Sequence, residues 1–352
     1  MQRCCSLQHR LAGFPNISIY GARVYKELSM TEKILYLSRE DVETVGVSMP
    51  EIIQALDATF REKGEGRFEM PPKPGIHPGK DAFLHAMPAY LPHFGAAGIK
   101  WVSGNPGNQE KGLPYIYGLL ILNDPETGKP LVVMDATWIT GKRTGAASAV
   151  AAKYLARKDS SSLGIIACGV QGRSHLEAFA CLFDLHKVRA YDCNPEAAER
   201  FAREMSAALQ LEIEVVSTPQ EAVRDMDMVV TSGPILKDPI PTIPPGWLAP
   251  GAFASPVDFD SYWTGAALAE MDKLATDDIN QMEYYRQIGF FQESPRAYAD
   301  LGEIASGRKP GRESSTERII CLNLGVALAD MATASLIYHK ARTKGIGRML
   351  PV

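Results

Sequence analysis

Residues 163–202 read LGIIACGVQGRSHLEAFACLFDLHKVRAYDCNPEAAERFA, and this stretch decides the fold. The apolar run LGIIAC precedes a glycine-containing turn and a helix, and the run VRAYD precedes Asn194-Pro195, which opens another helix. The segments IEVV, PQEAVRD and MDMVVTS extend the same alternation to residue 232. Repeated strand and helix units with short links predict a parallel sheet with helices on both faces.

The turn after the first strand, ACGVQG at 167–172, is a G-x-G-x-x-G pattern with Ala in the first slot. Gly169 would let the backbone approach a pyrophosphate, and Gly172 would permit close packing of the helix on the strand. Asp192 ends the next strand, 20 residues beyond Gly172, where an acid that binds the adenosine ribose is expected. The alternative is that the glycines only shape a turn and that Asp192 caps the next helix. The ensuing alternation favours a dinucleotide site.

The choice of dinucleotide depends on the charge near the ribose. A carboxylate at Asp192 would repel a 2′-phosphate, and no Arg stands in the next few residues to receive one. The sequence therefore predicts NAD as the cofactor, with NADP less favoured.

Composition narrows the class of protein. The 352 residues are enough for about two domains, and 45% hydrophobic with 22% charged residues is typical of a globular chain. Thirty-seven basic and 41 acidic residues give a net charge of −4, which provides no electrostatic footprint for nucleic acid. We expect a small-molecule partner.

The cysteines and the ends of the chain bear on its compartment. Six cysteines show no C-x-x-C or Cys/His ligand spacing, so we expect no metal site and a reducing cytoplasm. No apolar run approaches the roughly 18 to 20 residues of a membrane helix. Residues 1–30 lack the apolar core of a signal peptide and only faintly resemble a transit peptide. We interpret them as a disordered leader or a mispredicted start, with Met30 as a plausible true start.

The flanking segments predict further elements. Apolar residues at helical spacing predict a helix over 49–62, whereas residues 64–80 are rich in Gly, Pro and Lys and predict no regular element. Three short strands and a hairpin at DPETG follow. Helices are expected over 140–157 and, packed on the first domain, over 322–341.

Several separate motifs carry a resemblance. They are Met87-Pro88-Ala89, GIKWVSGNPGN (98–108), Gly112-Leu113-Pro114, DPETGKPL (124–131), RTGAA (143–147), GVQGR (169–173) and DLGEIASGR (300–308). In this order they resemble the ornithine cyclodeaminase and μ-crystallin family, which also holds archaeal-type alanine dehydrogenases and ketimine reductases. The resemblance covers nearly everything after Met30.

The resemblance implies an architecture. A Rossmann domain with a doubly wound parallel sheet, residues 140–320, would be inserted in a smaller α/β domain made of residues 31–139 and 321–352. The smaller domain would bind substrate and form a homodimer. The Rossmann part agrees with the alternation of strands and helices.

The resemblance also implies roles for individual residues. By position, Lys100 and Arg143 match residues that hold the substrate carboxylate and the cofactor region, and Asp260 matches the catalytic carboxylate. Lys73 is expected to contact substrate, and Lys100 to take part in catalysis beside Asp260. The implied cofactor contacts are Arg143, Thr144, Gly169, Val170, Gln171, Gly172, Asp192, Thr231, Ser232, Val257 and Asn323.

Three positions depart from the family pattern. Lys73 stands where many members have Arg, so a point charge replaces a bidentate fork. Asp260 is followed by Ser-Tyr-Trp-Thr in place of a Pro-Gly-Lys-like run, and Asn323 replaces the usual Ser. Together these departures argue against ornithine as the substrate.

Each charged candidate has a simpler interpretation. Lys73 could be a solvated loop lysine, and Lys100 could lie with its stem along an apolar strand surface. Arg143, near the start of the helix expected over 140–157, is poorly placed to stabilise the helix dipole, which favours an anionic ligand. Either Asp258 or Asp260 could be the catalytic carboxylate or an exposed loop acid, and we prefer Asp260.

Three histidines and two tyrosines are further candidate residues. His77, His85 and His93 cluster in sequence, but isolated histidines near Pro-rich turns more often serve structure or face solvent, so we assign them no metal. Tyr115 and Tyr117 could either reshape a pocket or form the outward face of a strand.

The residues suit hydride exchange at the α-carbon of an amino or imino acid, with three cations and one acid beside a nicotinamide. The first hypothesis is an NAD-dependent oxidoreductase of the alanine dehydrogenase or ketimine reductase type. The second is ornithine cyclodeaminase, an ammonia-lyase that forms proline. The third is a nucleotide-binding μ-crystallin-like or accessory protein with little catalysis.

Overall fold

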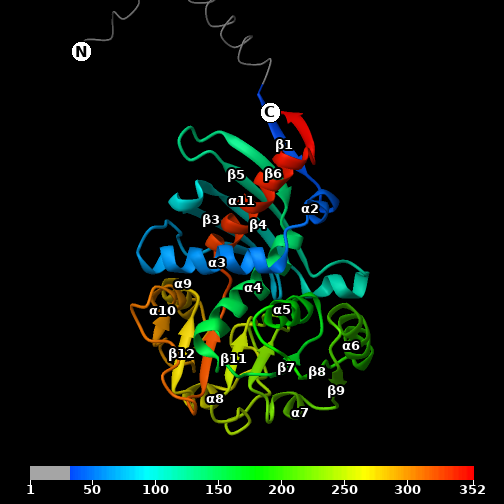
Figure 1. Ribbon diagram of the computed structural model, residues 1–352, viewed down its shortest axis with the longest axis vertical. Helices are drawn as coiled ribbons and strands as arrows, with labels where there is room; N and C mark the ends of the chain where they lie inside the picture. The colour runs from blue at the N-terminus through cyan, green and yellow to red at the C-terminus, as the bar shows by residue number, and fades with distance from the viewer. Residues whose placement is uncertain (1–31) are drawn as a thin grey trace, which may run out of the picture.

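The computed structural model describes residues 32–352, so the leader expected over residues 1–30 lies outside the described residues. Two sheets are stacked along the long axis, with helices between them (Figure 1). This arrangement confirms the predicted mixed α/β fold with a parallel sheet. Within the described residues, no helix is both long and apolar enough to cross a membrane.

A seven-stranded mixed sheet combines strands from both parts of the chain. Its order is β15-β1-β6-β5-β4-β3-β2. The C-terminal strand β15 pairs antiparallel with β1, and β1 pairs parallel with β6. The strands are β1 (Lys33–Leu37), β2 (Gly75–Gly79), β3 (Ala82–Leu91), β4 (Ala96–Gly104), β5 (Ile116–Asn123), β6 (Pro130–Asp135) and β15 (Arg348–Pro351). The predicted hairpin at DPETG is the turn between β5 and β6.

The second sheet has eight parallel strands in the order β13-β12-β14-β11-β10-β7-β8-β9. The strand order reverses between β7 and β10, which is the position where doubly wound folds bind their ligands. The strands are β7 (Ser162–Ile166), β8 (Lys187–Tyr191), β9 (Ile213–Val215), β10 (Met228–Thr231), β11 (Phe253–Pro256), β12 (Lys273–Thr276), β13 (Ala299–Asp300) and β14 (Ile319–Leu322).

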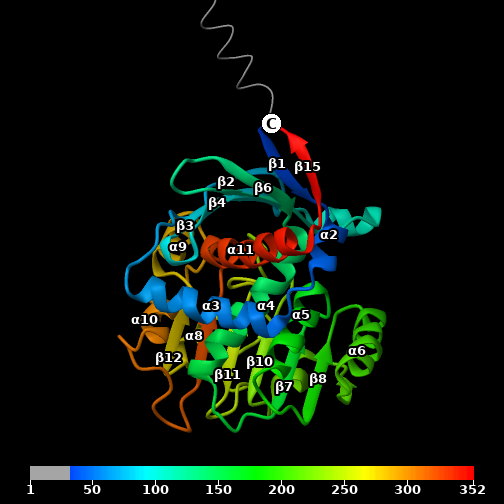
Figure 2. The same ribbon diagram turned by 45° about the horizontal axis from the view of Figure 1, so that its top comes forward.

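Helices α3, α4 and α11 fill the space between the two sheets. Helix α11 packs on β3 and β4 and contacts α3 and α4 on its other side (Figure 2). The helices are α2 (Arg39–Val45), α3 (Met49–Gly64), α4 (Thr137–Leu155), α5 (Val170–Ala180), α6 (Pro195–Leu209), α7 (Pro219–Val223), α8 (Gly265–Ala269), α9 (Ile279–Gln287), α10 (Leu301–Ala305) and α11 (Ala327–Lys344).

Three predicted element boundaries were wrong. The helix expected from Thr140 begins at Thr137, where the Asp135 side chain accepts the Trp138 amide at 3.1 Å. The helix expected over 322–341 is preceded by the buried strand β14, because periodicity cannot separate a short buried strand from a buried helix. The Gly- and Pro-rich segment 64–80 contains the exposed strand β2, which pairs antiparallel with β3 at the sheet edge, where Pro is tolerated.

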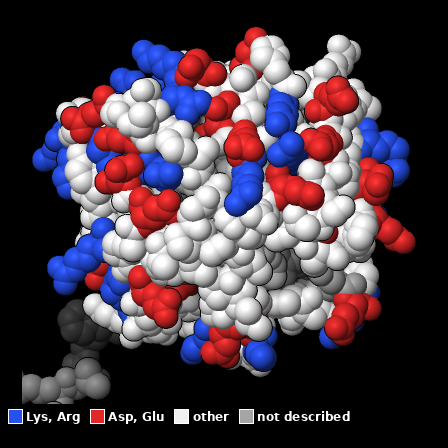
Figure 3. Space-filling model, turned by 90° about the horizontal axis from the view of Figure 1, so that it is seen from below, with Lys and Arg blue, Asp and Glu red and all other residues white. Residues whose placement is uncertain are grey.

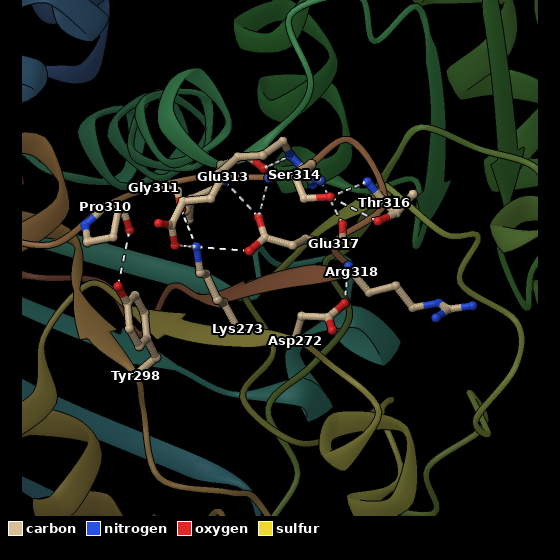
Figure 4. A network of polar contacts seen from close by, with 12 residues as sticks. Asp272, Lys273, Tyr298, Pro310, Gly311, Glu313, Ser314, Thr316, Glu317 and Arg318 are labelled. Carbon is tan, nitrogen blue, oxygen red and sulfur yellow. Dashed lines mark hydrogen bonds and ion pairs between the residues drawn. The ribbon is translucent and has the colours of Figure 1, made fainter.

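The amino end of β12 is a structural anchor. The Lys273 ammonium, itself buried, donates to Glu313 at 2.6 Å and to the Gly311 carbonyl at 2.7 Å, and it pairs with Glu317 at 3.0 Å (Figure 4). Asp272 accepts the amide of Arg318 at 2.7 Å. These contacts hold the loop between α10 and β14 on the eight-stranded sheet. Acidic and basic side chains are interspersed over the lower face of the molecule (Figure 3), as the small net charge predicts.

Helices α4 and α5 approach closely at two glycines. A Cβ on Gly145 would lie 2.5 Å from the backbone oxygen of Ser174, whereas a Cβ on Gly141 would lie 3.2 Å from a methyl group of Val170. The Val170 side chain is 70% exposed and can rotate away, but the Ser174 backbone cannot. Gly145 and Gly141 therefore allow a matched comparison of the same substitution, one in a tight contact and one in a loose contact.

We expect Gly145→Ala to lower the free energy of unfolding by about 2 kcal/mol, because overpacking forces the helices apart. Gly141→Ala should be neutral or stabilising by up to about 1 kcal/mol, because Ala favours the helix. Urea unfolding followed by circular dichroism measures both changes. Equal effects of the two substitutions would contradict the close contact at Gly145.

Candidate active site

The carboxyl ends of the parallel strands converge on one edge of the eight-stranded sheet. Most of the residues predicted to contact the cofactor follow directly after these strands. Asp192 follows β8, Thr231 ends β10 and is followed by Ser232, Val257 follows β11, and Asn323 follows β14. Gly169 to Gly172 lie at the junction of β7 and α5, beside the switch point.

The β7–α5 turn has the geometry of a dinucleotide loop. Ala167, in the first slot of the motif, has φ of 73°, a value that glycine adopts more easily. A Cβ on Gly172 would lie 2.6 Å from the Ala167 oxygen, whereas Gly169 faces open space. Gly169 is the N-cap of α5 and offers no side-chain cap, so the first helical amides face the turn. The Gln171 Oε1 is buried without a hydrogen-bond partner among the described residues.

Asp192 fastens this turn to the end of β8. Its Oδ2 accepts the Cys168 amide at 2.8 Å, and its Oδ1 accepts the Asn194 amide at 2.9 Å. Asn194, not Asp192, caps helix α6. The Asp192 carboxylate therefore stands at the position expected for ribose recognition, and the geometry fits a dinucleotide.

Asp258 is a buried structural acid, so its interpretation as an exposed loop acid was wrong. Its Oδ1 accepts the Thr231 hydroxyl at 2.9 Å, and its Oδ2 accepts the Gly233 amide at 3.1 Å. Burial raises the pKa of Asp258 to about 7. The predicted cofactor residues Thr231 and Ser232 use their hydroxyls within the protein, since Ser232 donates to the Ala167 carbonyl at 2.9 Å.

Asn323 lies in the interior between the sheet and α4. Its amide nitrogen donates to Ser148 at 3.1 Å and to Ser255 at 3.0 Å. The Ser148 hydroxyl also lies 2.9 Å from the His175 ring nitrogen Nε2. Asn323 thus joins β14, β11 and α4 through side-chain hydrogen bonds.

Two of the three predicted cations meet on a buried acid that the sequence analysis missed. Asp330 Oδ1 accepts from Lys100 Nζ at 2.7 Å and from Arg143 Nε at 2.9 Å, and all three side chains are buried. Thr140 Oγ1 lies 3.3 Å from the same ammonium. The available signal was that Asp330 is the one acid in the helix Ala327–Lys344.

Lys73 completes the cation cluster. Its ammonium donates to the carbonyls of Leu324 at 2.5 Å and Gly325 at 3.2 Å. It also lies 5.7 Å from the ring centre of Phe259 and 5.5 Å from that of Tyr285. Lys73 is 7% exposed, so its interpretation as a solvated lysine was wrong.

Burial changes the proton affinities of both lysines. It lowers the pKa of Lys73 to about 8, with Asp277 opposing and Arg143 adding to the effect. It lowers the pKa of Lys100 to about 7, with Arg143 again adding to the effect. Both ammonium groups can therefore exchange protons near neutral pH.

The cluster contains more hydrogen-bonding capacity than the protein uses. Asp330 Oδ2, Asp277 Oδ1 and the Tyr285 hydroxyl are buried without hydrogen-bond partners within residues 32–352. Burial also raises the pKa of Asp277 to about 6. The three cations outnumber Asp330 and Asp277, which favours an anionic group on the ligand, whereas the unpartnered carboxylate oxygens can accept hydrogen bonds from a ligand N–H group.

The aromatic residues and histidines separate into buried and exposed groups. His85 is buried, its ring lies 4.4 Å from that of Phe83, and burial lowers its pKa to about 3, so it is neutral. Its ring lies 6.3 Å from that of Tyr285, which places it beside the cluster. Tyr117 lies on the exposed face of β5, whereas the hydroxyl of Tyr115 is buried. The described residues contain no group of three potential metal ligands.

Asp260 follows Phe259 in the chain and has hydrogen-bond partners different from those of the cation cluster. Its Oδ2 accepts the Phe291 amide at 2.7 Å, and its Oδ1 is buried without a partner in the described part of the chain. The carboxyl group borders a cavity of about 230 Å³ lined also by Trp263, Phe290 and Glu293. No hydrogen bond or ion pair of the described residues joins Asp260 to the cation cluster, and burial raises its pKa.

Comparisons with known proteins find relatives over nearly the whole described chain. The model of the ornithine cyclodeaminase/mu-crystallin family matches residues 32–345. Alanine dehydrogenase of Archaeoglobus fulgidus is 38% identical over 330 residues, which cover 89% of this chain and 97% of the relative.

Two solved structures are similar over the same length. One is the Thermococcus litoralis Delta(1)-pyrroline-2-carboxylate reductase in complex with NADH and L-proline, at 36% identity and a TM-score of 0.82. The similarity covers 90% of this chain and 99% of the reductase chain. The other is an archaeal alanine dehydrogenase dimer with bound NAD, at 36% identity and a TM-score of 0.81, covering 91% and 99%.

We expect Asp330→Asn to lower the free energy of unfolding by about 3 kcal/mol at about pH 6, because two buried cations lose their carboxylate. Burial already lowers the pKa of Lys100 to about 7. The loss should therefore shrink at about pH 8.5, where Lys100 is neutral in the folded state and only Arg143 still carries charge. Urea unfolding at both pH values measures the change.

Asp238→Asn, at an exposed acid, serves as the control and should leave the stability unchanged at both pH values. Equal losses for Asp330→Asn at the two pH values would show that Lys100 keeps its proton throughout this range.

Proposed function

The chain belongs to the ornithine cyclodeaminase/mu-crystallin family, and on that premise we propose that it is an NAD-dependent oxidoreductase acting at the α-carbon of a small amino acid or the corresponding imine. The observation that carries the proposal is the buried group of Lys73, Lys100 and Arg143, which has unpartnered polar atoms and lies at the carboxyl edge of a dinucleotide-binding sheet. Relatives of this chain include an alanine dehydrogenase and a Delta(1)-pyrroline-2-carboxylate reductase.

The cations bind the substrate carboxylate. Lys73 reaches the site from the loop before β2, and Arg143 projects from α4 with its Nε held by Asp330. The remaining guanidinium nitrogens are free to form a fork for a carboxylate. Phe259 and Tyr285 exclude water on the side of Lys73, which strengthens its electrostatic attraction.

The cofactor is NAD. When bound, NAD(H) would supply hydride transfer at the α-carbon of the substrate. Gly169, Val170 and Gln171 would hold the pyrophosphate at the N-terminus of α5, and Asp192 would hold the ribose hydroxyls and repel a 2′-phosphate. The resemblance to the family implies that Arg143, Thr144, Val257 and Asn323 would lie at the nicotinamide end.

Lys100 and Asp260 share the proton transfer. In the reductive direction the substrate nitrogen must receive a proton, and the Lys100 pKa of about 7 suits a group that gives up a proton near neutrality. The role of Asp260 rests on the resemblance to the family and on its buried Oδ1, which has no partner among the described residues and could accept from a cationic nitrogen. Asp277, with its pKa raised to about 6, favours the protonated form of Lys73.

An apolar surface supports a homodimer. Trp101 on β4 pairs in register with Leu119 on β5, and both are about half exposed together with Tyr117. Adjacent exposed apolar side chains of this size favour contact with a second copy of the chain. The free thiols of Cys168, Cys181, Cys193 and Cys321 support a cytoplasmic location.

The function is tested by oxidation of NADH and NADPH with α-keto acids plus ammonia or methylamine, and with cyclic imines. An ornithine-to-proline assay is run on the same preparation. Oxidation of NADH in preference to NADPH with one substrate class supports the proposal. Proline without net oxidation identifies a cyclodeaminase, and no turnover in either assay identifies a binding or accessory protein.

We expect kcat/KM for the imine to fall above about pH 7, where Lys100 loses the proton that it donates, and more steeply above about pH 8, where Lys73 loses the proton that binds the carboxylate. Lys73→Arg should move only the second, steeper limb to higher pH, because a guanidinium keeps its charge. The measurement is kcat/KM from about pH 6 to 10 for both proteins. A steeper limb that stays in place in Lys73→Arg would belong to another group.

We expect Asp260→Asn to lower kcat about 100-fold or more, with the affinity for NADH nearly unchanged. An Asn oxygen can still accept the Phe291 amide, so the loop should keep its conformation. Steady-state kinetics and fluorescence titration with NADH measure the two quantities. Full activity of Asp260→Asn would exclude a catalytic role for Asp260 and leave the proton transfer to Lys100.

A further inference from the structure

Another buried lysine, Lys63, connects the two layers of the molecule away from the cation cluster. Lys63, at the end of α3, donates to Asp300 and lies 3.1 Å from the Asp278 carboxylate. All three side chains are buried. The acids raise the Lys63 pKa despite its burial, so the Lys63 ammonium keeps its proton.

The two acids begin two different helices. Asp278 is the N-cap of α9 and accepts the Gln281 amide at 2.6 Å. Asp300 is the N-cap of α10, accepts the Gly302 amide at 2.7 Å and lies 3.3 Å from the Ile279 amide. Lys63 therefore fixes the starts of both helices to the end of α3.

The backbone confirms that this contact is tight. Gly64 follows Lys63, and a Cβ on Gly64 would lie 2.0 Å from the Gly302 carbonyl oxygen. Arg308 donates to the Gly64 carbonyl from the same side. The first turn of α10 thus has little freedom to move relative to α3. The start of α9 is tied to α10 by the Ile279 amide on Asp300 and to α3 by Lys63 on Asp278.

The first turn of α9 also reaches the candidate active site. Asp277, the neighbour of Asp278, accepts the Gly325 amide at 2.7 Å. Gln281, one turn further, donates to the Gly325 carbonyl at 3.1 Å. Lys73 donates to the same carbonyl at 3.2 Å.

Gly325 lies between the two cations that bind the carboxylate. Its φ of +82° requires glycine, and a Cβ there would lie 2.8 Å from a guanidinium nitrogen of Arg143. The Gly325 backbone thus contacts Lys73 through its carbonyl and Arg143 through its α-carbon. A shift of Gly325 would change the separation of the two cations.

We propose that Lys63 is a positioning residue for the substrate carboxylate, acting through α9 and Gly325 on the spacing of Lys73 and Arg143. The inference rests on the proposed function only in taking the ligand to be a carboxylate. Lys63 contacts neither of these cations, so its effect is on their geometry.

The test measures binding without turnover. Calorimetry gives the Kd for NADH and, with NADH present, the Kd for pyrrole-2-carboxylate, a planar carboxylate that resembles a cyclic imine. We expect Lys63→Met to raise the Kd for the carboxylate about tenfold and to leave the Kd for NADH unchanged. Lys63→Arg, which keeps the charge, should restore most of the affinity.

The chain offers a matched control. Lys273 is also a buried lysine between two carboxylates, but it lies at the amino end of β12, away from the site (Figure 4). Lys273→Met should destabilise the fold and leave the Kd for the carboxylate unchanged. If Lys63→Met does not fold, the double variant Lys63→Met/Asp300→Asn leaves one buried carboxylate in place of two and keeps an N-cap on α10.

The binding measurements separate the positioning role of Lys63 from the proposed function. Unchanged carboxylate binding in the Lys63 variants, or equal weakening in Lys273→Met, would overturn the positioning role. Binding by the unmodified protein without any turnover would overturn the proposed function and leave the Lys63 comparison valid. A protein that binds NADH but no carboxylate would overturn both.

Discussion

The buried carboxylate of Asp330 accepts hydrogen bonds from Lys100 and Arg143 through one oxygen, and much of the structure depends on this interaction. The three side chains come from α11, β4 and α4, which lie far apart in sequence. Two buried cations without this carboxylate would carry a large desolvation penalty. The same interaction therefore packs the layers between the sheets and concentrates positive charge where an anionic substrate would bind.

The amino and carboxyl ends of the parallel strands have different roles. The four-residue strand β12 shows both. At its amino end Lys273 and its acids hold a loop in place, with all their charges paired. At its carboxyl end Asp277 has an unpartnered oxygen and faces Lys73 and Gly325. Strand carboxyl ends of a doubly wound sheet face the crevice where helix N-termini also point, so ligand chemistry gathers at that edge. Both ends of β12 contain buried charge, but among the described residues only its carboxyl end has a buried charged atom without a hydrogen-bond partner.

Sequence reasoning predicted the elements whose signals are local. The alternation over 163–232, the hairpin at DPETG and the motif at 167–172 depend on neighbouring residues, and the structure contains each of them. It missed β2 and β14, because an edge strand of Gly and Pro and a short buried strand before a helix lack a distinctive period. It also missed Asp330 and the burial of His85, since both depend on what other segments place around them.

The sequence by itself determined the class of fold and the dinucleotide turn, because turn dihedrals and periodicity belong to residues close in the chain, and its resemblance to a family singled out the three cations. Only the tertiary structure decided that Lys73, Lys100, Arg143 and Asp330 meet, and that Asp258 is buried in hydrogen bonds while Asp260 borders a cavity. It alone decided the proton affinities of the two site lysines. A pKa depends on burial and on charges brought near by folding, and neither is a property of the local sequence.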